Sequence, residues 1–327
     1  MSPRLLPKPA QLLLAPLVLL YAAALAAKNL AYDQCWITPK RLEWPVVSIG
    51  NLSVGGAGKT PVAIRLAQLL QNAGVSVDVL SRGYGRSSDE VTRVDPAGSP
   101  SQYGDEPLLM AGNGIPVFVG ADRHAVGLLA ERSQPTPGIH LLDDGLQHRR
   151  LARDLDIVVL HRTDFNQHLL PTGRLREPLS ALHRASILIL RVDDRDLEAE
   201  LHRRNITAPI WIQHRRLDIE PTFRAIAFCG IARPDEFFSA LRARGTDLAA
   251  TSAFRDHHAW TDTDLDALLQ LRTRHNAESF ITTEKDFVRL TPVQRERLAP
   301  LHIARLEVVF ENETAIAAHL ASLLMRK

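Results

Sequence analysis

A glycine-rich loop between an apolar strand and a helix is the feature that most constrains the fold of this 327-residue chain. The stretch Val46 to Thr60 reads VVSIGNLSVGGAGKT and matches the phosphate-loop pattern G-x-x-x-x-G-K-[ST] except at its first position, where Ser53 replaces glycine. Backbone N–H groups of such a loop converge on phosphate oxygens, and the following helix N-terminus adds partial positive charge. Lys59 is expected to reach the outer phosphates, and the Thr60 hydroxyl to hold Mg²⁺. The predicted nucleotide-binding residues are Ser53, Val54, Gly55, Gly56, Ala57, Gly58, Lys59 and Thr60.

Composition limits the classes of protein and partner that fit this chain. Its 45% hydrophobic and 23% charged residues are those of an ordinary globular protein, long enough for two domains. A formal net charge of +2 does not indicate a nucleic-acid partner, and we expect none. The two cysteines, Cys35 and Cys229, lie far apart and match neither a zinc site nor a disulfide framework. A reducing compartment is the simpler interpretation.

The N-terminus departs from this ordinary composition. No charged side chain lies between Lys8 and Lys28, which leaves an apolar run of 19 residues that could just span a bilayer. A secretory signal peptide, a membrane helix and a buried helix of the core are the alternatives. Because a phosphate loop of the ATP type would be idle outside the cell, we favour a retained membrane or interfacial helix within residues 1–40. The nucleotide site then lies on the cytoplasmic face.

Apolar strands alternate with helical patterns along the rest of the chain. The helix after the loop places Val62, Leu66 and Leu70 on one face. Strand patterns cover residues 75–80, 115–119, 139–144, 155–160, 187–190 and 209–212. Nearly continuous apolar strands between helices indicate a mostly parallel sheet that is covered on both faces. The segment from Gln213 to Arg224 is charged and lacks a clear period, and a new strand–helix cycle follows it.

We therefore predict an α/β fold of the P-loop NTPase type, with a mostly parallel sheet and helices on both faces. The hydrophobic N-terminal helix occupies residues 1–40, the P-loop core residues 41–215, and a smaller C-terminal α/β lobe residues 216–327. Because no Ser/Gly-rich linker is present, we expect a short ordered connection between the two lobes.

Another apolar strand ends in two carboxylates, Asp143 and Asp144. At this position P-loop enzymes complete the Mg²⁺ shell that the loop hydroxyl begins, so one of the two aspartates is expected to bind the metal together with Thr60. Adjacent carboxylates are costly to keep ionised unless a cation or donors stand nearby. Strand alternation points them to opposite sides, so they should not share one role. A solvated Asp-Asp-Gly turn is the alternative interpretation.

The identity of the nucleotide depends on a missing motif. GTP-specific members of the P-loop class usually carry an Asn/Thr-Lys-x-Asp sequence. The nearest run here, Thr283 to Asp286, reads TEKD and does not match it. We therefore predict ATP as the nucleotide.

Eight segments of the chain, taken in order, resemble one enzyme family. They read GNLSVGGAGKTP, SRGYGR, YGDEP, LDDGLQHRRLARDLDI, PTGRLREP, FCGIARPDEFF, FRDHHAW and TTEKDFVRL. In these segments the chain is similar to tetraacyldisaccharide 4'-kinase of lipid A biosynthesis, and Ser53 at the irregular loop position also fits that family. The resemblance implies an ATP- and Mg²⁺-dependent kinase that phosphorylates the 4'-hydroxyl of a glycolipid, tetraacyldisaccharide 1-phosphate. The product is lipid IVA, made at the inner membrane by a catalytic domain on its cytoplasmic face.

The same resemblance assigns the chemistry to Asp105, His257 and Lys59. Asp105 in YGDEP matches the family's proposed catalytic aspartate, and His257 in FRDHH matches its partner, although local sequence alone does not separate it from His258. The aspartate lies in the first lobe and the histidine in the second, so they would meet only if the lobes closed over ATP and excluded water. Since a sugar hydroxyl loses its proton late in phosphoryl transfer, an aspartate can serve as the base, and the histidine would orient it.

Several other positions match the family pattern. Arg123, Arg176 and Glu177 correspond to positions implicated in phosphate or substrate contacts, and structural ion pairs are their alternative interpretation. Tyr84 could line the nucleotide or sugar site, and Gln147 could bind near the metal or nucleotide. A basic cluster is either a solvated loop or a contact for anionic headgroups or the substrate 1-phosphate, and it comprises His148, Arg149, Arg150 and Arg153.

Two interpretations of the sequence without a kinase activity stay open at this point. The chain could be a partner-regulated, membrane-associated P-loop ATPase that uses hydrolysis as a conformational switch. A non-catalytic nucleotide sensor fits the loop and the N-terminal helix but leaves Asp105 and the paired aspartates unused. Lys285 and Asp286 resemble the family pattern too, and the sequence assigns them no role.

Overall fold

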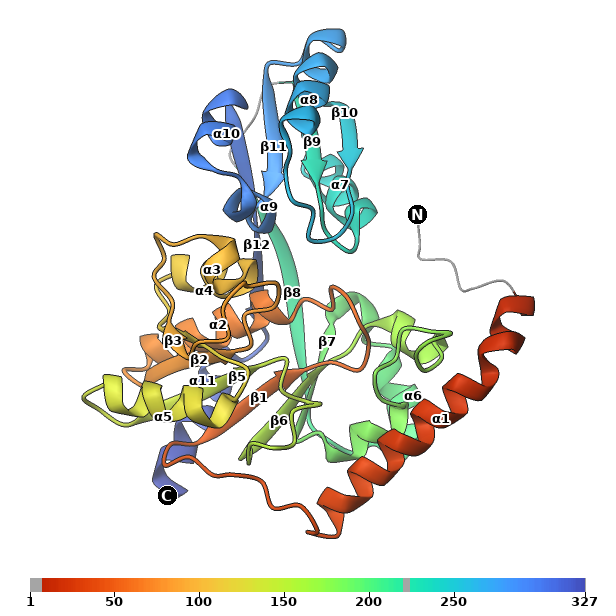
Figure 1. The fold of residues 1–327 in the computed structure, drawn as a ribbon, viewed down its shortest axis with the longest axis vertical. Helices are drawn as coiled ribbons and strands as arrows, with labels where there is room; N and C mark the ends of the chain where they lie inside the picture. Colours follow the sequence, from red (N-terminus) through yellow and green to blue (C-terminus); the bar gives the residue numbers. More distant parts are fainter. Residues whose placement is uncertain (1–7, 220–223, 327) are drawn as a thin grey trace.

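A computed structural model describes residues 8–219 and 224–326 of the chain, and within these residues twelve strands form one continuous sheet (Figure 1). In spatial order the strands are β10 (Leu248–Ala253), β9 (Ala225–Cys229), β11 (Ser279–Thr283), β12 (Leu301–Phe310), β8 (Ile210–Asp218), β7 (Ile187–Arg191), β6 (Leu155–Val159), β1 (Val46–Gly50), β5 (Gly138–Asp143), β2 (Ser76–Ser81), β4 (Val117–Val119) and β3 (Thr92–Arg93). Neighbouring strands run parallel except β12 with β8 and β3 with β4. The predicted mostly parallel α/β sheet is confirmed.

Helices cover the sheet because its strands bury side chains on both faces. Along β6, Ile157 and Val159 belong to one core cluster, whereas Val158 belongs to another. This near-continuous burial is what a parallel sheet between two helical layers requires. The helices are α1 (Lys8–Asp33), α2 (Lys59–Asn72), α3 (Pro100–Tyr103), α4 (Asp105–Gly112), α5 (Arg123–Ser133), α6 (Leu197–Arg203), α7 (Pro234–Ala243), α8 (Asp262–Arg274), α9 (Glu284–Arg289), α10 (Pro292–Arg297) and α11 (Glu313–Ala321).

Strands β8 and β12 join the lower part of the molecule to the upper one (Figure 1). The interpretation of residues from Gln213 onward as irregular is wrong for the stretch up to Asp218, which continues β8. These residues pair antiparallel with β12, from Gln213 opposite Phe310 to Asp218 opposite Arg305. A two-stranded connection buries few side chains, so it carries charges that hide the strand pattern in the sequence.

The last helix returns to the first lobe. Ile316 and Leu320 of α11 lie in the same core cluster as Val62 and Leu66 of α2. The predicted division at residue 216 assigned this helix to the C-terminal lobe, whereas its packing is with the P-loop core. The division of the chain into domains otherwise stays a prediction.

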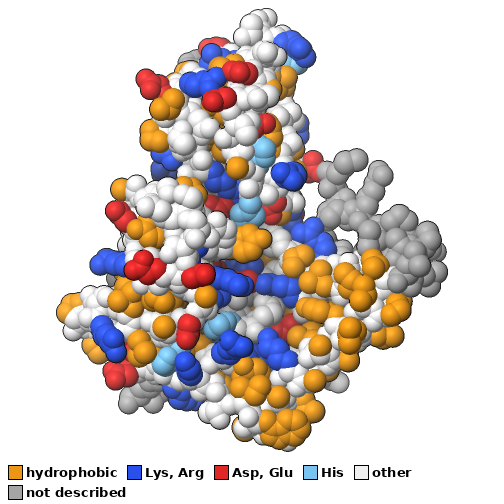
Figure 2. All heavy atoms as spheres, in the orientation of Figure 1, with side chains coloured by type: hydrophobic (Ala, Val, Ile, Leu, Met, Phe, Trp, Pro, Cys, Tyr) orange, Lys and Arg blue, Asp and Glu red, His pale blue; other side chains and the backbone are white. Residues whose placement is uncertain are grey.

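Helix α1 lies along one side of the lower lobe (Figure 1). Its segment Leu14–Asp33 is long and apolar enough to cross a membrane. Leu17, Leu19 and Leu20 are 51%, 71% and 67% exposed, and Figure 2 shows hydrophobic side chains gathered over this helix. Such an apolar surface indicates a membrane or protein contact.

Candidate active site

The phosphate loop connects β1 to α2 in the centre of the sheet. Gly58 caps α2 in a left-handed conformation, with φ of 84°, which glycine adopts without strain. Lys59 begins the helix, and its Nζ lies 2.8 Å from Oδ1 of the buried Asn51 and 3.2 Å from Oδ1 of Asp144. Thr60 is 3% exposed. The loop therefore has the strand, turn and helix that a phosphate site needs.

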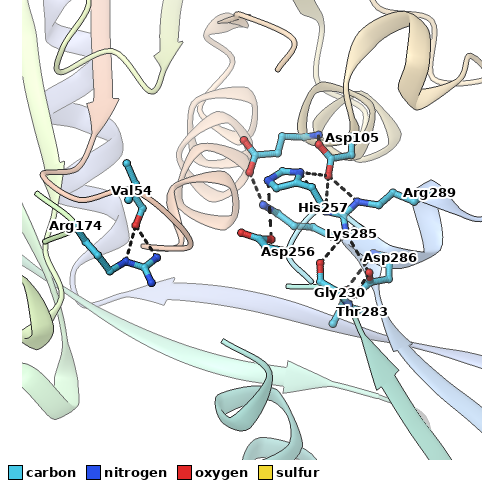
Figure 3. Close-up of polar contacts among 11 residues, drawn as sticks. Val54, Asp105, Arg174, Gly230, Asp256, His257, Thr283, Lys285, Asp286 and Arg289 are labelled. Carbon is cyan, nitrogen blue, oxygen red and sulfur yellow. Dashed lines mark hydrogen bonds and ion pairs between the residues drawn. The ribbon is translucent and has the colours of Figure 1, made fainter. Parts of the chain in front are cut away.

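Two arginines hold the outside of this loop. Arg174 donates to the carbonyl oxygen of Val54, with its nearer nitrogen at 2.8 Å (Figure 3). Arg215 of β8 donates to the carbonyl oxygen of Ala57 at 2.9 Å, and one of its nitrogens would lie 2.0 Å from a Cβ at Gly58. Burial, followed by the charge of Arg191, lowers the pKa of Arg215 to about 10. Two loop carbonyls are thus bound by arginines from outside the loop, while the N–H groups of Val54 and Ala57 donate to the carbonyl oxygens of Arg174 and Gly55 at 2.8 and 2.9 Å.

The two adjacent aspartates at the end of β5 have different surroundings. Asp143 is the last strand residue, and its Oδ2 accepts a hydrogen bond from Ser81 Oγ at 2.9 Å. Its Oδ1 is buried and has no hydrogen-bond partner among the residues that the structure describes. Burial, with the charges of Glu106 and Asp144, raises the pKa of Asp143 to about 7. Because burial and nearby negative charges disfavour its ionised form, this carboxylate is stabilised by a cation beside it.

Asp144 leaves the strand in a left-handed conformation, with φ of 51°. Its carboxylate contacts Lys59 and accepts two hydrogen bonds from Arg176, each of 2.6 Å. Burial would raise the pKa of Asp144, but the hydrogen bond from Arg176 and the charge of Lys59 hold it well below its usual value. The expectation that the two aspartates face different partners agrees with these contacts.

A metal would have few protein ligands here. Across residues 8–219 and 224–326, no group of three or more His, Cys, Asp and Glu side chains is arranged to hold a metal ion. Mg²⁺ in nucleotide sites is bound by one or two protein oxygens together with phosphates and water. Thr60 and the unpartnered oxygen of Asp143 fit that kind of site.

A second group of side chains lies where the two lobes meet. Asp105 begins α4, and its Oδ2 is 3.0 Å from Nδ1 of His257, which lies on the loop after β10 (Figure 3). Gly104, with φ of 89°, positions α4, because a Cβ there would lie 2.9 Å from the carbonyl oxygen of Tyr84. His257 is itself in the left-handed region, with φ of 57°, a conformation that non-glycine residues hold at some cost. The structure thus brings together two residues 152 positions apart.

Electrostatics keep this carboxylate ionised. Burial raises the pKa of Asp105, but the hydrogen bond from His257 and the charge of Arg289 outweigh burial and hold the pKa well below its usual value. The hydrogen bond that His257 donates to Asp105 raises the pKa of His257. His258 points elsewhere, since its Nε2 lies 3.0 Å from Oδ2 of Asp264. The geometry therefore distinguishes the two histidines that the sequence left open.

The remaining predicted residues fall into two groups. Tyr84 is 71% exposed, and its ring lies 5.8 Å from that of His257. Gln147 donates to the carbonyl oxygen of Asn51 at 3.0 Å, beside the loop. In contrast, Arg123 is buried against the carbonyl oxygens of Gly120 and Ala121, and Glu177 is buried with Arg184. These contacts favour the alternative of structural roles for Arg123 and Glu177.

Sequence reasoning missed several residues of the site. Asn51 directly follows β1 and binds both Lys59 and Arg176, at 2.8 and 2.6 Å. A polar residue at the carboxyl end of a central strand was a usable signal for it. Arg289 contacts Asp105 and His257, and although it lies in the family-like segment TTEKDFVRL, its role was not predicted.

Comparisons with known proteins identify the family of this chain. A family model described as LpxK, Tetraacyldisaccharide-1-P 4'-kinase, matches residues 10–325. The chain is 41% identical over 325 residues to tetraacyldisaccharide 4'-kinase from Koribacter versatilis (strain Ellin345), covering 95% of this chain and 99% of that protein. It is 38% identical over 328 residues to the enzyme of that name from Geobacter metallireducens, covering 93% and 96%.

A solved structure extends the likeness to three dimensions. LpxK from Aquifex aeolicus in complex with ATP matches with a TM-score of 0.78 and 32% identity, covering 97% of this chain and 99% of that one. The chain therefore belongs to the tetraacyldisaccharide 4'-kinase (LpxK) family and has the lipid A 4'-kinase function that its sequence predicted.

Proposed function

We propose that this kinase uses Asp105 as its general base and His257 as the partner that orients it. The observation that carries this assignment is the 3.0 Å contact between the two side chains across the two lobes. Glu106, the residue after the base, interacts electrostatically with both Asp143 and Lys59. Because Lys59 belongs to the phosphate loop, the base lies close to that loop. In the transfer, the 4'-hydroxyl proton passes to Asp105, the hydroxyl oxygen bonds to the γ-phosphorus, and ADP leaves.

The phosphate loop, residues 53–60, holds the triphosphate in this proposal. Lys59 is already fixed between Asn51 and Asp144, so little side-chain entropy is lost when it turns to the γ-phosphate. Arg176 is bound to the same two residues and adds positive charge at the edge of the site. Such preorganised cations stabilise the charge of the transferring phosphoryl group. Tyr84 and Gln147 line the approaches to the sugar and the nucleotide.

We assign the Mg²⁺ site to Thr60 and Asp143. The metal would neutralise charge on the β- and γ-phosphate oxygens. Asp143 supports the assignment because it offers a buried oxygen without a partner among the described residues. Asp144 is the weaker candidate, since its carboxylate is bound by Lys59 and Arg176.

The membrane side of the proposal rests on α1 and the basic residues beside it. The apolar α1 would enter the inner membrane from its cytoplasmic face, where ATP is available. Lys28 of α1 donates to the backbone carbonyl oxygen of Gln147, and Arg149 pairs with Asp33 of α1. Each basic side chain near an anionic membrane surface contributes about 1 kcal/mol of attraction. The glycolipid would thus meet the site at the bilayer surface.

A kinase assay on the full chain in detergent tests the base. With labelled ATP, Mg²⁺ and tetraacyldisaccharide 1-phosphate, we expect Asp105→Asn to lower kcat by about a hundred-fold or more and His257→Ala by roughly ten-fold to a hundred-fold. His258→Ala is the matched control and should stay within about three-fold, because His258 bonds to Asp264 within its own lobe. A folded Asp105→Asn variant with normal lipid phosphorylation would overturn the assignment. ATP consumption without glycolipid product would instead favour the ATPase switch.

A further inference from the structure

Arg289, the last residue of α9, connects the two lobes at the proposed base. Its side chain is 7% exposed, and its Nε donates to Asp105 Oδ2 at 2.8 Å. A second nitrogen of the guanidinium contacts the same oxygen, at 2.5 Å. On its other side, Arg289 donates to the carbonyl oxygen of Gly230 at 2.8 Å and to Asp286 Oδ1 at 3.1 Å (Figure 3). One buried cation therefore joins α4 of the first lobe to two elements of the second.

We propose that Arg289, held in place by Asp286, is a positioning residue that fixes the orientation and the ionisation of Asp105. This inference rests on the proposed role of Asp105 as the base. It also gives a function to the segment Thr283–Arg289.

Asp286 forms the support for the arginine. It is completely buried, and its Oδ1 accepts the backbone N–H of Gly230 at 2.9 Å. Its Oδ2 accepts a hydrogen bond from Thr283 Oγ1 at 2.6 Å. A Cβ at position 230 would lie 3.2 Å from Asp286 Oδ1, so glycine permits this close approach. Both oxygens of Asp286 are thus fixed, and with them the direction in which Arg289 points.

Contacts at Asp105 differ between its two oxygens. Oδ2 receives two guanidinium nitrogens of Arg289 and Nδ1 of His257. Because a carboxylate oxygen accepts, Nδ1 carries the proton in the last contact. Oδ1 accepts the backbone N–H of Glu106 at 3.0 Å, which leaves it the oxygen with accepting capacity for the hydroxyl proton. Arg289 therefore selects which oxygen of Asp105 acts and keeps the carboxylate ready for that proton.

A second cation of α9 strengthens the same alignment. Lys285 forms an ion pair with Glu106, the residue after the base, and α4 packs on α9. Two cations four positions apart on α9 thus face two consecutive acidic residues at the start of α4. The charged groups around Asp105 are His257, Arg289, Lys285, Glu106 and Asp286, with Asp256 beside His257.

This arrangement predicts a pH signature. The positive charge of Arg289 lowers the pKa of Asp105, so its removal should raise that pKa and move the acidic limb of the kcat profile to higher pH. A residue that only holds the lobes together would change stability or activity at all pH values alike. The position of the acidic limb therefore distinguishes a positioning role from a structural one.

The test uses the full chain in detergent with ATP, Mg²⁺ and tetraacyldisaccharide 1-phosphate, assayed from the lowest pH at which the wild type stays folded up to pH 9, because the pKa of Asp105 lies below the usual carboxyl value. We expect Arg289→Met to lower kcat by about thirty-fold or more, with KM for ATP within about three-fold, and to move the acidic limb up by about one pH unit or more. Arg289→Lys keeps the charge without the fork and should fall between wild type and Arg289→Met. Asp286→Asn should give a smaller loss with the limb displaced in the same direction.

Arg295→Met is the matched control, because Arg295 lies in the same lobe and donates to the carbonyl oxygen of Phe287. It should leave kcat and the limb unchanged. Thermal unfolding establishes that each variant is folded, and if Arg289→Met is not, Arg289→Lys and Asp286→Asn carry the test. Wild-type kcat, or a loss of kcat without displacement of the limb, would overturn the positioning role. Asp105→Asn separates the two proposals: if that variant is inactive while Arg289→Met is normal, only the positioning inference fails.

Discussion

Arg176 donates to both carboxylate oxygens of Asp144, at 2.6 Å each. The ionised Asp144 is further balanced by Lys59, 3.2 Å away. Its neighbour Asp143 forms no ion pair with a cation in the part of the chain that the structure describes and keeps one buried oxygen without a hydrogen-bond partner there. The two adjacent aspartates therefore have different surroundings: Asp144 binds the cations of the site, and Asp143 is the aspartate to which we assign the metal in our proposal.

This division predicts different responses to magnesium. Asp143→Asn should raise the Mg²⁺ concentration for half-maximal activity by about ten-fold or more, because it weakens an oxygen ligand of a cation that binds few protein groups. Asp144→Asn should mainly lower kcat, since it releases Lys59 and Arg176. The measurement is kcat against Mg²⁺ at saturating ATP, with the thermal shift produced by MgATP as a second readout. The opposite pattern in the two variants would place the metal at Asp144.

The outer contacts of the phosphate loop lead to a prediction about nucleotide affinity. Loss of the bond from Arg215 to Ala57 in Arg215→Met should raise KM for ATP roughly ten-fold, since a hydrogen bond from a charged donor contributes about 1.5 kcal/mol. Arg216→Met is the control, because Arg216 is the exposed next residue of β8. Equal KM values for the two variants would show that the contact does not support the loop.

Residues near the loop also show how far sequence reasoning reached. The strand, the glycines and the helix at Lys59 have strong local patterns, so their structure followed from the sequence. Arg215 did not, because β8 was predicted to end at Ile212 and its charged continuation resembles a loop. The contact of Asp105 with His257 was expected only from a resemblance. The contact of Arg289 with Asp105 depends on the orientation of the short helix α9 against α4. Contacts across 152 and 184 positions arise from tertiary packing, which no local period encodes.

A buried histidine away from the site predicts how stability depends on pH. Nδ1 of His140 lies 2.7 Å from Asp78 Oδ1, and its Nε2 lies 3.5 Å from Glu131 Oε1. Burial would lower the pKa of His140, but the charge of Asp78 and the hydrogen bonds with Asp78 and Glu131 raise it to about 9. Because the folded pKa exceeds the unfolded value of 6.5, this contribution is complete below pH 6.5 and is lost as the pH rises through 9.

We therefore expect the free energy of unfolding to fall by up to about 3 kcal/mol between pH 6.5 and pH 9. His140→Gln should be less stable at pH 6 and should lose most of this dependence, whereas His183→Gln, a change at an exposed histidine, should keep it. Chemical denaturation at pH 6, 7.5 and 9 measures how the free energy of unfolding changes with pH in the wild type and in the two variants. If the free energy of unfolding of His140→Gln changed with pH as in the wild type, His140 with its partners Asp78 and Glu131 would not titrate in this range.

Helix α1 contacts the active-site segments as well as offering an apolar surface. The hydroxyl of Tyr21 donates to the carbonyl oxygen of Arg176 at 2.8 Å, so the helix holds the segment whose side chain binds Asp144. Tyr21→Phe removes this bond and should lower kcat/KM for the glycolipid about five-fold, as expected for about 1 kcal/mol, while KM for ATP stays unchanged. Tyr32→Phe, on the same helix, keeps the ring over which Arg149 lies and serves as the control. If α1 were only an anchor, vesicle binding and kcat/KM would be the same in both variants and in the wild type.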